Sequence, residues 1–321
     1  MLVDRVRPLA VYALVVAVGA AAFLYPFWIP SSAFAGQAHN GDAPLVAALV
    51  GALVVGAVTL ELRRGTMNGA TVAVLGVLAA SAGLLRLIEL PGGGNGIFFL
   101  VVLAGAAFGA RFGLLLGLCS MAVSAVITGG LGPWLPFQML ALGWMGGAAG
   151  VLGLVTARLR PRAEVVVLAV YGWVWGFVYG AIMNLWFWPF ERGGALDWRP
   201  GLGLGGTLHR YWSFYVATSL GWDAAAAITN AVLILVTGMA VMRTLRRFDA
   251  RPRGRRVRNA EQHQRWIERQ RRERVRRHAD GLVAVHGRDD RDARREVPED
   301  IAEATVVGSD DLVRHRPADA R

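Results

Sequence analysis

Long apolar runs dominate the first 250 residues of this chain, separated by short polar or glycine-rich stretches. Several runs approach or exceed the roughly 20 residues that an α-helix needs to cross a bilayer. By length, the pattern predicts an all-α membrane protein with about eight transmembrane helices, at 9–29, 43–62, 68–88, 97–110, 112–128, 134–158, 164–188 and 212–243. The fourth and fifth runs are short and separated only by Arg111. Either these two runs form a tight helical hairpin, or one of the two helices does not cross the whole membrane.

Arginine is concentrated on one side of these predicted spans. Two arginines precede the first span, and others follow the second, fourth, sixth and eighth; they are Arg5, Arg7, Arg63, Arg64, Arg111, Arg158, Arg160, Arg162, Arg243, Arg246 and Arg247. On the other side only residues 190–211 break the pattern, with Arg192, Arg199 and Arg210. Since arginine-rich loops stay in the cytoplasm, we expect a multi-pass protein of the plasma membrane with both termini cytoplasmic. The first run reaches Trp28 and further spans follow, so we expect a retained helix there rather than a cleaved signal peptide.

Composition excludes several functions. The chain has no lysine, so it lacks the G-x-x-x-x-G-K-[ST] loop that binds ATP, and an ATP-driven activity would need another subunit. Its single cysteine, Cys119, cannot form an intrachain disulfide, and no Cys/His spacing suits a metal. No histidine–carboxylate cluster or nucleophile elbow is present. We therefore expect no catalytic residues, no metal and no cofactor, and we do not expect an enzyme.

The last part of the chain, residues 249–321, has a different composition. It is rich in Arg, Asp and Glu and poor in large apolar residues, which predicts a basic, largely disordered cytoplasmic tail. Paired charges such as Glu261 and Arg265 predict a helix at 259–278 within it. Such a helix would be solvated or lie against anionic lipid headgroups, and nucleic acid is not an expected partner.

Small residues recur at four-residue spacing in the third predicted span, across the fourth and fifth, and in the seventh. The sets are Gly76/Ala80 and Ala79/Gly83, then Gly105/Gly109/Gly113/Gly117, then Gly172/Gly176/Gly180. This spacing gives a flat helix face on which another helix can pack closely. The face serves either packing within the chain or docking to a separate membrane subunit, and Gly76, Ala79, Ala80 and Gly83 are the candidates for docking.

Ionisable and amide side chains inside the spans are the candidates for function, because a charge in the bilayer must be paired or hydrated. Asp223, about a third of the way into the eighth span, has no basic neighbour at i±3 or i±4. It forms either a structural hydrogen bond or part of a substrate cavity. Arg86 and Glu89, at the end of the third span, either pair with each other or flank a cavity mouth beside the glycine-rich loop that contains Asn95. Further candidates for the cavity lining are Trp134, Gln138, Tyr179, Asn184 and Tyr215.

Three segments resemble the substrate-binding S components of energy-coupling factor (ECF) transporters. GATVAVLGVLAASAGLLRLIEL is similar to the family's first helix, and FLVVLAGAAFGARFGLLLGLCSMAVSAVITGG is similar to its second and third helices. GGLGPWLPFQMLALGWMGGAAG, residues 129–150, resembles the loop and fourth helix of a subset of these proteins. The resemblance implies two extra helices at 1–67, a six-helix substrate-binding unit at 68–248, and the tail at 249–321.

The resemblance also implies a function. S components capture vitamins and work with a transmembrane T component and two ATP-binding subunits. Small residues around Gly76 match the family's contact surface for the T component, and the family's substrate cavity opens outward. The expected function is thus the substrate-capture subunit of an ATP-driven micronutrient importer, with cobalamin or a related vitamin as first guess. The alternatives are a proton-coupled secondary transporter using Asp223 and an integral-membrane enzyme.

Overall fold

The computed structural model describes residues 2–28, 39, 41–63, 65, 67–90, 94–191, 194–248 and 266–270. The chain divides into two compact units, Met1–Gly254 and Arg255–Arg321. In the second unit the described residues, 266–270, are helical. The rest of the helix predicted at 259–278 lies outside the described residues.

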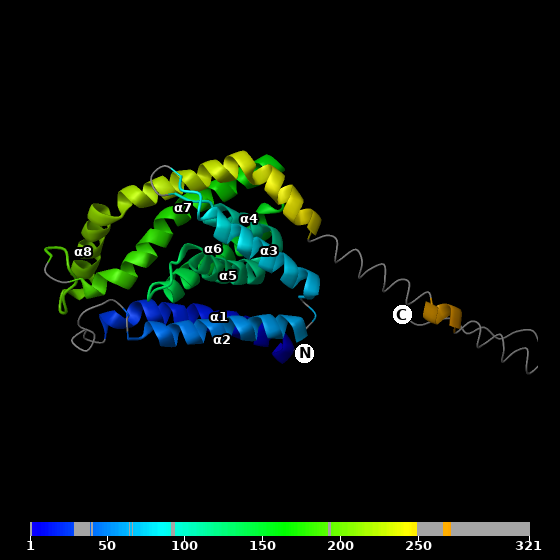
Figure 1. Ribbon diagram of the computed structural model, residues 1–321, viewed down its shortest axis with the longest axis horizontal. Helices are drawn as coiled ribbons and strands as arrows, with labels where there is room; N and C mark the ends of the chain where they lie inside the picture. The colour runs from blue at the N-terminus through cyan, green and yellow to red at the C-terminus, as the bar shows by residue number, and fades with distance from the viewer. Residues whose placement is uncertain are drawn as a thin grey trace, which may run out of the picture. The chain divides into compact units, whose positions relative to one another are not determined.

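The first unit is built of helices (Figure 1). They are α1 (Leu2–Leu24), η1 (Tyr25–Phe27), α2 (Ala43–Arg63), α3 (Gly69–Leu85), α4 (Ile97–Phe108), α5 (Ala110–Thr128), α6 (Leu135–Thr156), α7 (Pro161–Phe187), η4 (Trp188–Phe190), α8 (Gly203–Thr218) and the Leu220–Phe248 helix. Among the described residues, five helices are long and apolar enough to cross a membrane: Ala43–Arg63, Ala110–Thr128, Leu135–Thr156, Pro161–Phe190 and Leu220–Phe248. Three shorter apolar helices, Tyr12–Phe27, Gly69–Leu85 and Ile97–Phe108, account for the other predicted spans. The all-α membrane fold is confirmed.

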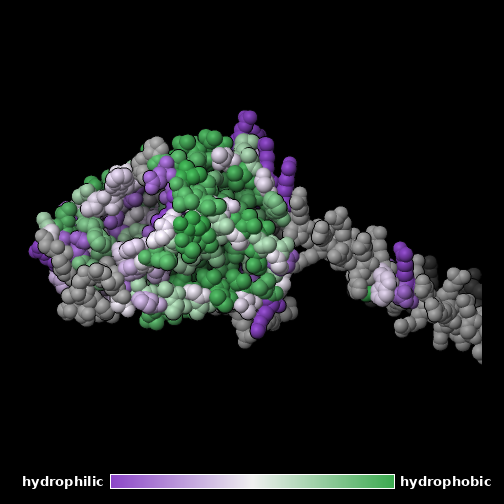
Figure 2. Space-filling view, viewed as in Figure 1, coloured by the Kyte–Doolittle hydropathy of each residue, from purple (hydrophilic) through white to green (hydrophobic). Residues whose placement is uncertain are grey.

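The helices run back and forth between two ends of the unit. We call the end where α1 begins and the Leu220–Phe248 helix finishes the tail end, and the opposite end, where α6 begins and α7 finishes, the site end. Figure 2 shows hydrophobic side chains covering much of the middle of the bundle, with strongly hydrophilic side chains beyond them. An apolar exterior of this kind suits lipid contact.

Glycines let α4 and α5 pack directly on the backbone of α6. A Cβ atom at Gly105 or Gly113 would collide with the carbonyl oxygen of Gly146, and one at Gly117 would collide with that of Leu142. The fully buried side chains of α6 include Phe137, Leu140 and Met145. This face of small residues therefore serves packing within the chain, the first of the two roles expected for such faces.

A one-residue turn joins α4 to α5. Gly109 has φ 97° and ψ 171°, a conformation open essentially only to glycine. With 12 residues, α4 is about 18 Å long, less than the roughly 30 Å thickness of the hydrocarbon core. The segment is thus a tight hairpin whose first helix is short.

The eighth predicted span, 212–243, is divided differently in the structure. Residues 203–218 form the separate helix α8, and the long helix begins at Leu220, after Ser219 leaves helical geometry with φ −126°. Figure 1 shows α8 set at a steep angle to the long helix that follows it. The helix α8 exposes an apolar stripe at four-residue spacing, formed by Leu204, Leu208, Trp212 and Val216. This amphipathic pattern is typical of a helix that lies along the membrane surface instead of crossing it.

The boundary changes the environment of Asp223. Asp223 lies in the first turn of the Leu220–Phe248 helix, not a third of the way along a span, and its backbone N–H donates to the Ser219 carbonyl at 3.0 Å. The first turn of a helix carries partial positive charge from unpaired N–H groups, which favours a carboxylate. The N-terminal end of this helix therefore stabilises the Asp223 carboxylate at this position.

The helices α1 and α2 pack against the bundle and are tied to it by a buried carboxylate. A Cβ at Gly19 would meet the Trp144 ring at 2.5 Å, and Phe23 packs edge-on against Phe137 with ring centroids 5.1 Å apart. At the tail end Glu61, only 3% exposed, accepts hydrogen bonds from Tyr12 Oη at 3.0 Å and Arg111 Nη1 at 3.2 Å. The Arg111–Glu61 ion pair joins α2 to the start of α5.

We expect Arg111→Ala to destabilise the protein by about 2 kcal/mol, because it removes the guanidinium that donates a hydrogen bond to the buried Glu61 carboxylate. Glu61→Gln should cost less, since the amide oxygen still accepts from both partners. Thermal unfolding in detergent measures both variants. Arg158→Ala, at an exposed position in the α6–α7 turn, is the matched control; an equal loss in that variant would contradict the role of the ion pair.

Candidate functional site

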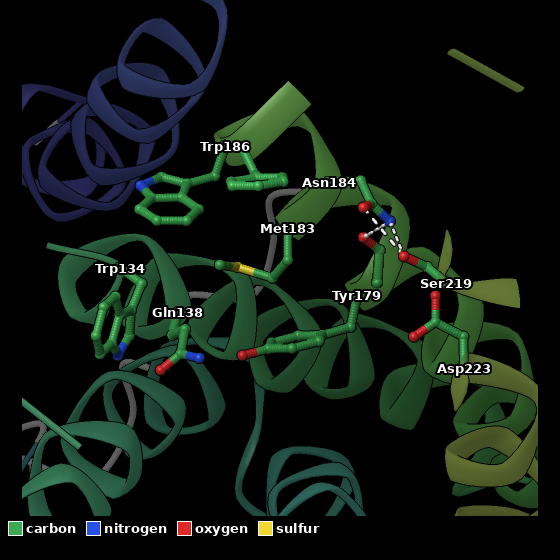
Figure 3. A pocket seen from close by; sticks show the side chains of 10 residues that line it. Trp134, Gln138, Tyr179, Met183, Asn184, Trp186, Ser219 and Asp223 are labelled. Carbon is green, nitrogen blue, oxygen red and sulfur yellow. Dashed lines mark hydrogen bonds between the residues drawn. The ribbon is translucent and has the colours of Figure 1, made fainter. Parts of the chain in front are cut away.

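A cavity of about 440 Å³ opens at the site end of the bundle, between α6, α7 and the start of the Leu220–Phe248 helix. It is lined by Trp134, Gln138, Tyr179, Gly180, Met183, Asn184, Trp186, Phe187, Ser219 and Asp223. Five of the predicted site residues are in this set: Trp134, Gln138, Tyr179, Asn184 and Asp223. Figure 3 shows them around a common space, with aromatic rings on one side and the carboxylate on the other.

Asp223 is positioned by close contact with α7. Its carboxylate lies against Gly180, where a Cβ atom would overlap both carboxylate oxygens. One turn earlier, a Cβ at Gly176 would lie 2.5 Å from Ala227 Cα. The glycine face of α7 therefore serves packing against the last helix, and it brings the carboxylate to the cavity wall. Asp223 Oδ2 is buried and makes no hydrogen bond of ordinary geometry among the described residues, although the Tyr215 hydroxyl lies close to this carboxylate.

Two amide side chains at the cavity differ in how they are satisfied. Asn184 Nδ2 donates hydrogen bonds to the Ser219 hydroxyl at 2.8 Å and to the Gly180 carbonyl at 3.1 Å. The Ser219 hydroxyl donates in return to Asn184 Oδ1 at 3.1 Å. Gln138 Oε1, in contrast, is buried without a partner in the part of the chain that is described. Figure 3 shows the hydroxyl end of Tyr179 directed toward Gln138. Gln138 and Asp223 thus offer the cavity polar atoms that a ligand could satisfy.

Aromatic rings form the other wall. The indole of Trp134 lies against Gly132, and a Cβ atom at Gly132 would collide with the ring. Trp134 Nε1 donates a hydrogen bond to the Gly130 carbonyl at 3.3 Å. Trp134 and Trp186 meet edge to face with centroids 6.5 Å apart. Met183 and Phe187 complete this wall. A few polar groups set among aromatic surfaces are typical of small-molecule sites.

The connection between α1 and α2 places His39 behind this wall. The His39 ring stacks on Trp186 with centroids 5.8 Å apart and an interplanar angle of 19°, and it is 1% exposed. His39 Nδ1 lies 2.7 Å from Asp42 Oδ2, which also accepts from Tyr25 Oη at 2.7 Å. Burial alone would raise the pKa of Asp42, but the hydrogen bonds from His39 and Tyr25 outweigh it and hold the pKa below its ordinary value.

The other four predicted lining residues do not line the cavity. Arg86 Nη1 donates to Met121 Sδ at 3.2 Å and Ser124 Oγ at 3.4 Å, which ties the end of α3 to α5. Glu89 is exposed, and no ion pair joins it to Arg86 in the described part of the chain. Asn95 Oδ1 accepts from the Ile97 N–H at 3.2 Å at the start of α4. Tyr215 is 4% exposed and packs beside Trp212.

The four residues predicted for partner binding divide between two faces of α3. Ala79 and Gly83 are buried, and a Cβ at Gly83 would lie 3.1 Å from the Ser124 backbone nitrogen of α5. Gly76 is exposed with nothing within 4 Å of an added Cβ, and Ala80 is partly exposed. Only Gly76 and Ala80 therefore remain available to a second subunit.

Sequence reasoning missed Ser219, Met183 and Phe187 as lining residues, and it missed His39. Met183 and Phe187 lie on α7 at helical spacing from Gly180 and Asn184, and this spacing could have indicated both of them. Ser219 and His39 reach the site through a helix break and a long connection, and neither leaves a periodic signal.

These features define a class: an all-α membrane protein with a ligand-sized, partly polar cavity near one membrane surface. Residues 70–238, just over half of the chain, match the family model described as ECF transporter, substrate-specific component. The chain belongs to this family of substrate-specific components of ECF transporters, as the resemblance indicated. The family consists of transporter subunits and not of enzymes. No curated protein and no solved structure matches the chain.

We expect Gly180→Ala to lower the melting temperature of the protein, because the new methyl group would displace the Asp223 carboxylate and push the last helix away from α7. Gly221→Ala, two residues before Asp223 with nothing within 4 Å of the added Cβ, is the matched control. That change should leave stability unchanged or raise it by up to about 1 kcal/mol, since alanine favours the helix. Thermal unfolding of the two variants measures the difference; equal behaviour would contradict the close packing of Asp223 on Gly180.

Proposed function

We propose that this protein captures a water-soluble micronutrient at the 440 Å³ cavity and passes it to an ATP-driven ECF importer. The observation that carries the proposal is the coincidence of the family match with a cavity in which Gln138 Oε1 and Asp223 Oδ2 are buried without a hydrogen bond of ordinary geometry among the described residues. The family provides the role of substrate capture. Asp223 and Gln138 provide the groups that a ligand would satisfy.

The chemistry of the lining indicates the kind of ligand. Asp223 and Gln138 Oε1 present acceptor oxygens, so they favour a ligand with N–H or O–H donors or a positive charge. Trp134, Trp186 and Tyr179 provide flat apolar surfaces that suit a ring. The volume lies in the lower half of the range typical of small-molecule sites, about 300–1,000 Å³. It favours a vitamin-like molecule of one or two rings over the corrinoid ring of cobalamin.

We further propose that the site end faces outward and that both termini are cytoplasmic. The tail end carries the exposed Arg63, Arg158, Arg160 and Arg162, as a cytoplasmic surface does. The membrane would then be the plasma membrane, and a ligand from outside would reach the cavity without crossing the bilayer. A transmembrane T component and two ATP-binding subunits would drive its release, since the chain has no ATP-binding loop of its own.

Asp223→Asn should weaken ligand binding about tenfold or more while the folded yield stays close to that of the wild type, because it removes a charged acceptor from the cavity. The ligand is first identified by mass spectrometry of the compound that copurifies with the protein, and its affinity is then measured by calorimetry. Trp134→Ala should also weaken binding. Trp222→Ala, an exposed neighbour of Asp223 at 67% exposure, is the control. Normal affinity combined with easy unfolding of Asp223→Asn would show that this residue is structural.

Gly76→Leu and Ala80→Leu should each weaken copurification with a T component while leaving ligand affinity unchanged, because a branched side chain would hold two helix backbones apart. Gly51→Leu on α2 is the matched control, as Gly51 is also exposed with nothing within 4 Å of an added Cβ. Unchanged copurification in both α3 variants would remove the proposed docking face. Transport by the purified protein in vesicles without ATP-binding subunits would favour the secondary transporter instead.

A further inference from the structure

A second cavity, of about 560 Å³, lies at the site end between the end of α1, the end of α7 and α8. It shares no lining residue with the first cavity. Its walls are almost entirely apolar and include Phe27, Trp28, Trp188, Trp198 and Leu208. Trp188 is fully buried and Trp198 is 8% exposed, so the two indoles form a fixed inner wall.

Three polar side chains in these walls, those of Trp188, Thr207 and Tyr211, have hydrogen-bond partners inside the protein. Trp188 Nε1 donates to the Leu196 carbonyl at 2.9 Å, and Thr207 Oγ1 donates to the Gly203 carbonyl at 2.7 Å. Tyr211 Oη donates to the Ala181 carbonyl. The interior therefore offers mainly apolar surface, and of its lining side chains only the indole N–H groups of Trp28 and Trp198 and the Arg199 guanidinium have no hydrogen bond within the described residues. Such a surface suits a hydrocarbon chain better than a polar solute.

Arg199 is the one charged side chain among the lining residues. It is exposed, and it makes no hydrogen bond or ion pair within the described part of the chain. Arg210 of α8, in contrast, is held by the protein: its Nη1 donates to the carbonyls of Ala195 at 3.0 Å and Asp197 at 3.2 Å, which fixes the loop that carries Arg199. A free guanidinium at the edge of an apolar cavity is suited to bind an anionic oxygen, above all a phosphate.

The cavity opens toward the surface that faces lipid. Leu204 and Leu208 line the cavity and also belong to the exposed apolar stripe of α8, with exposures of 78% and 57%. Since an amphipathic helix of this kind lies among headgroups and upper acyl chains, the nearest source of a chain with an anionic head is the bilayer itself. A soluble anion would gain nothing from the aromatic interior.

We propose that this cavity is a binding site for an anionic phospholipid of the surrounding bilayer, with an acyl chain between α1, α7 and α8 and the phosphate at Arg199. The site is independent of the ligand cavity, so its test does not depend on the proposed transport function. It also gives a role to Arg199, one of the three arginines of residues 190–211 that break the charge pattern of the other loops. A lipid in this place would fill the space between α1 and α8.

The experiment uses the full-length protein in nanodiscs of equal parts phosphatidylglycerol and phosphatidylcholine, followed by native mass spectrometry of the lipid that stays bound after release. The wild type should retain phosphatidylglycerol in preference to phosphatidylcholine. Arg199→Gln should reduce that preference about tenfold, the effect of losing one charge-assisted hydrogen bond. Arg158→Gln, which removes an exposed charge at the tail end, should keep it. Equal retention of both lipids by the wild type, or equal behaviour of the two variants, would overturn the proposal.

A second variant tests the acyl chain separately from the headgroup. Thr207→Phe places a ring in the cavity and should reduce retention of both lipids, whereas Arg199→Gln changes only the preference between them. Inorganic phosphate is the remaining comparison. If phosphate alone raises the melting temperature of the detergent-solubilised protein as much as phosphatidylglycerol does, Arg199 binds an anion without a chain and the lipid assignment is wrong.

Discussion

Direct contact between helix backbones around α6 is the constraint on which the rest of this structure depends. Gly105, Gly113 and Gly117 bring α4 and α5 onto the carbonyl oxygens of α6, closer than any larger residue would permit. In a bilayer the apolar surface of a helix gains little from leaving lipid, so close packing must supply the attraction that water supplies in a soluble protein. The short helix α4 can be buried beside α6 only because its partners carry glycine at these points.

The same device positions the charged group of the candidate site. Gly180 and Gly176 let the last helix approach α7 until the Asp223 carboxylate lies against the α7 backbone. The helix break at Ser219 sets the depth, because it places Asp223 in a first turn whose unpaired N–H groups favour negative charge. A carboxylate held in this way can remain near the bilayer without a cationic partner, available to a ligand.

The sequence indicated most of the fold, since each apolar run is long compared with the loops around it. It also located the cavity through Trp134, Gln138, Asn184 and Asp223, because isolated polar residues stand out in apolar runs. It failed at α8, where no proline marks the break and the apolar stripe at Leu204, Leu208, Trp212 and Val216 continues to within three residues of the next apolar run. In that segment the four-residue spacing of apolar side chains predicts an amphipathic helix at the membrane surface, whereas the length of the apolar run alone predicts a transmembrane span.

The errors among site residues have a different physical origin. Arg86 and Asn95 are polar residues near the ends of helices, and such residues satisfy local needs first: Asn95 accepts from the first N–H of α4, and Arg86 ties α3 to α5. Among the residues expected to bind a partner, Ala79 and Gly83 are buried and Gly76 and Ala80 are not, because only one side of α3 contacts α5. Four-residue spacing defines two faces of a helix equally well and does not say which one is buried.

The N-terminal helices are part of this architecture, although residues 70–238 alone match the family. They are joined to the bundle at three levels: Glu61 pairs with Arg111 at the tail end, Phe23 packs on Phe137 of α6, and His39 stacks on Trp186 at the site end. Trp186 therefore stands between the cavity and a ring that the matched region does not contain. Under the proposed function, an aromatic wall would select ligands through the position of its rings, so His39, outside the matched region, would contribute to ligand preference by holding Trp186.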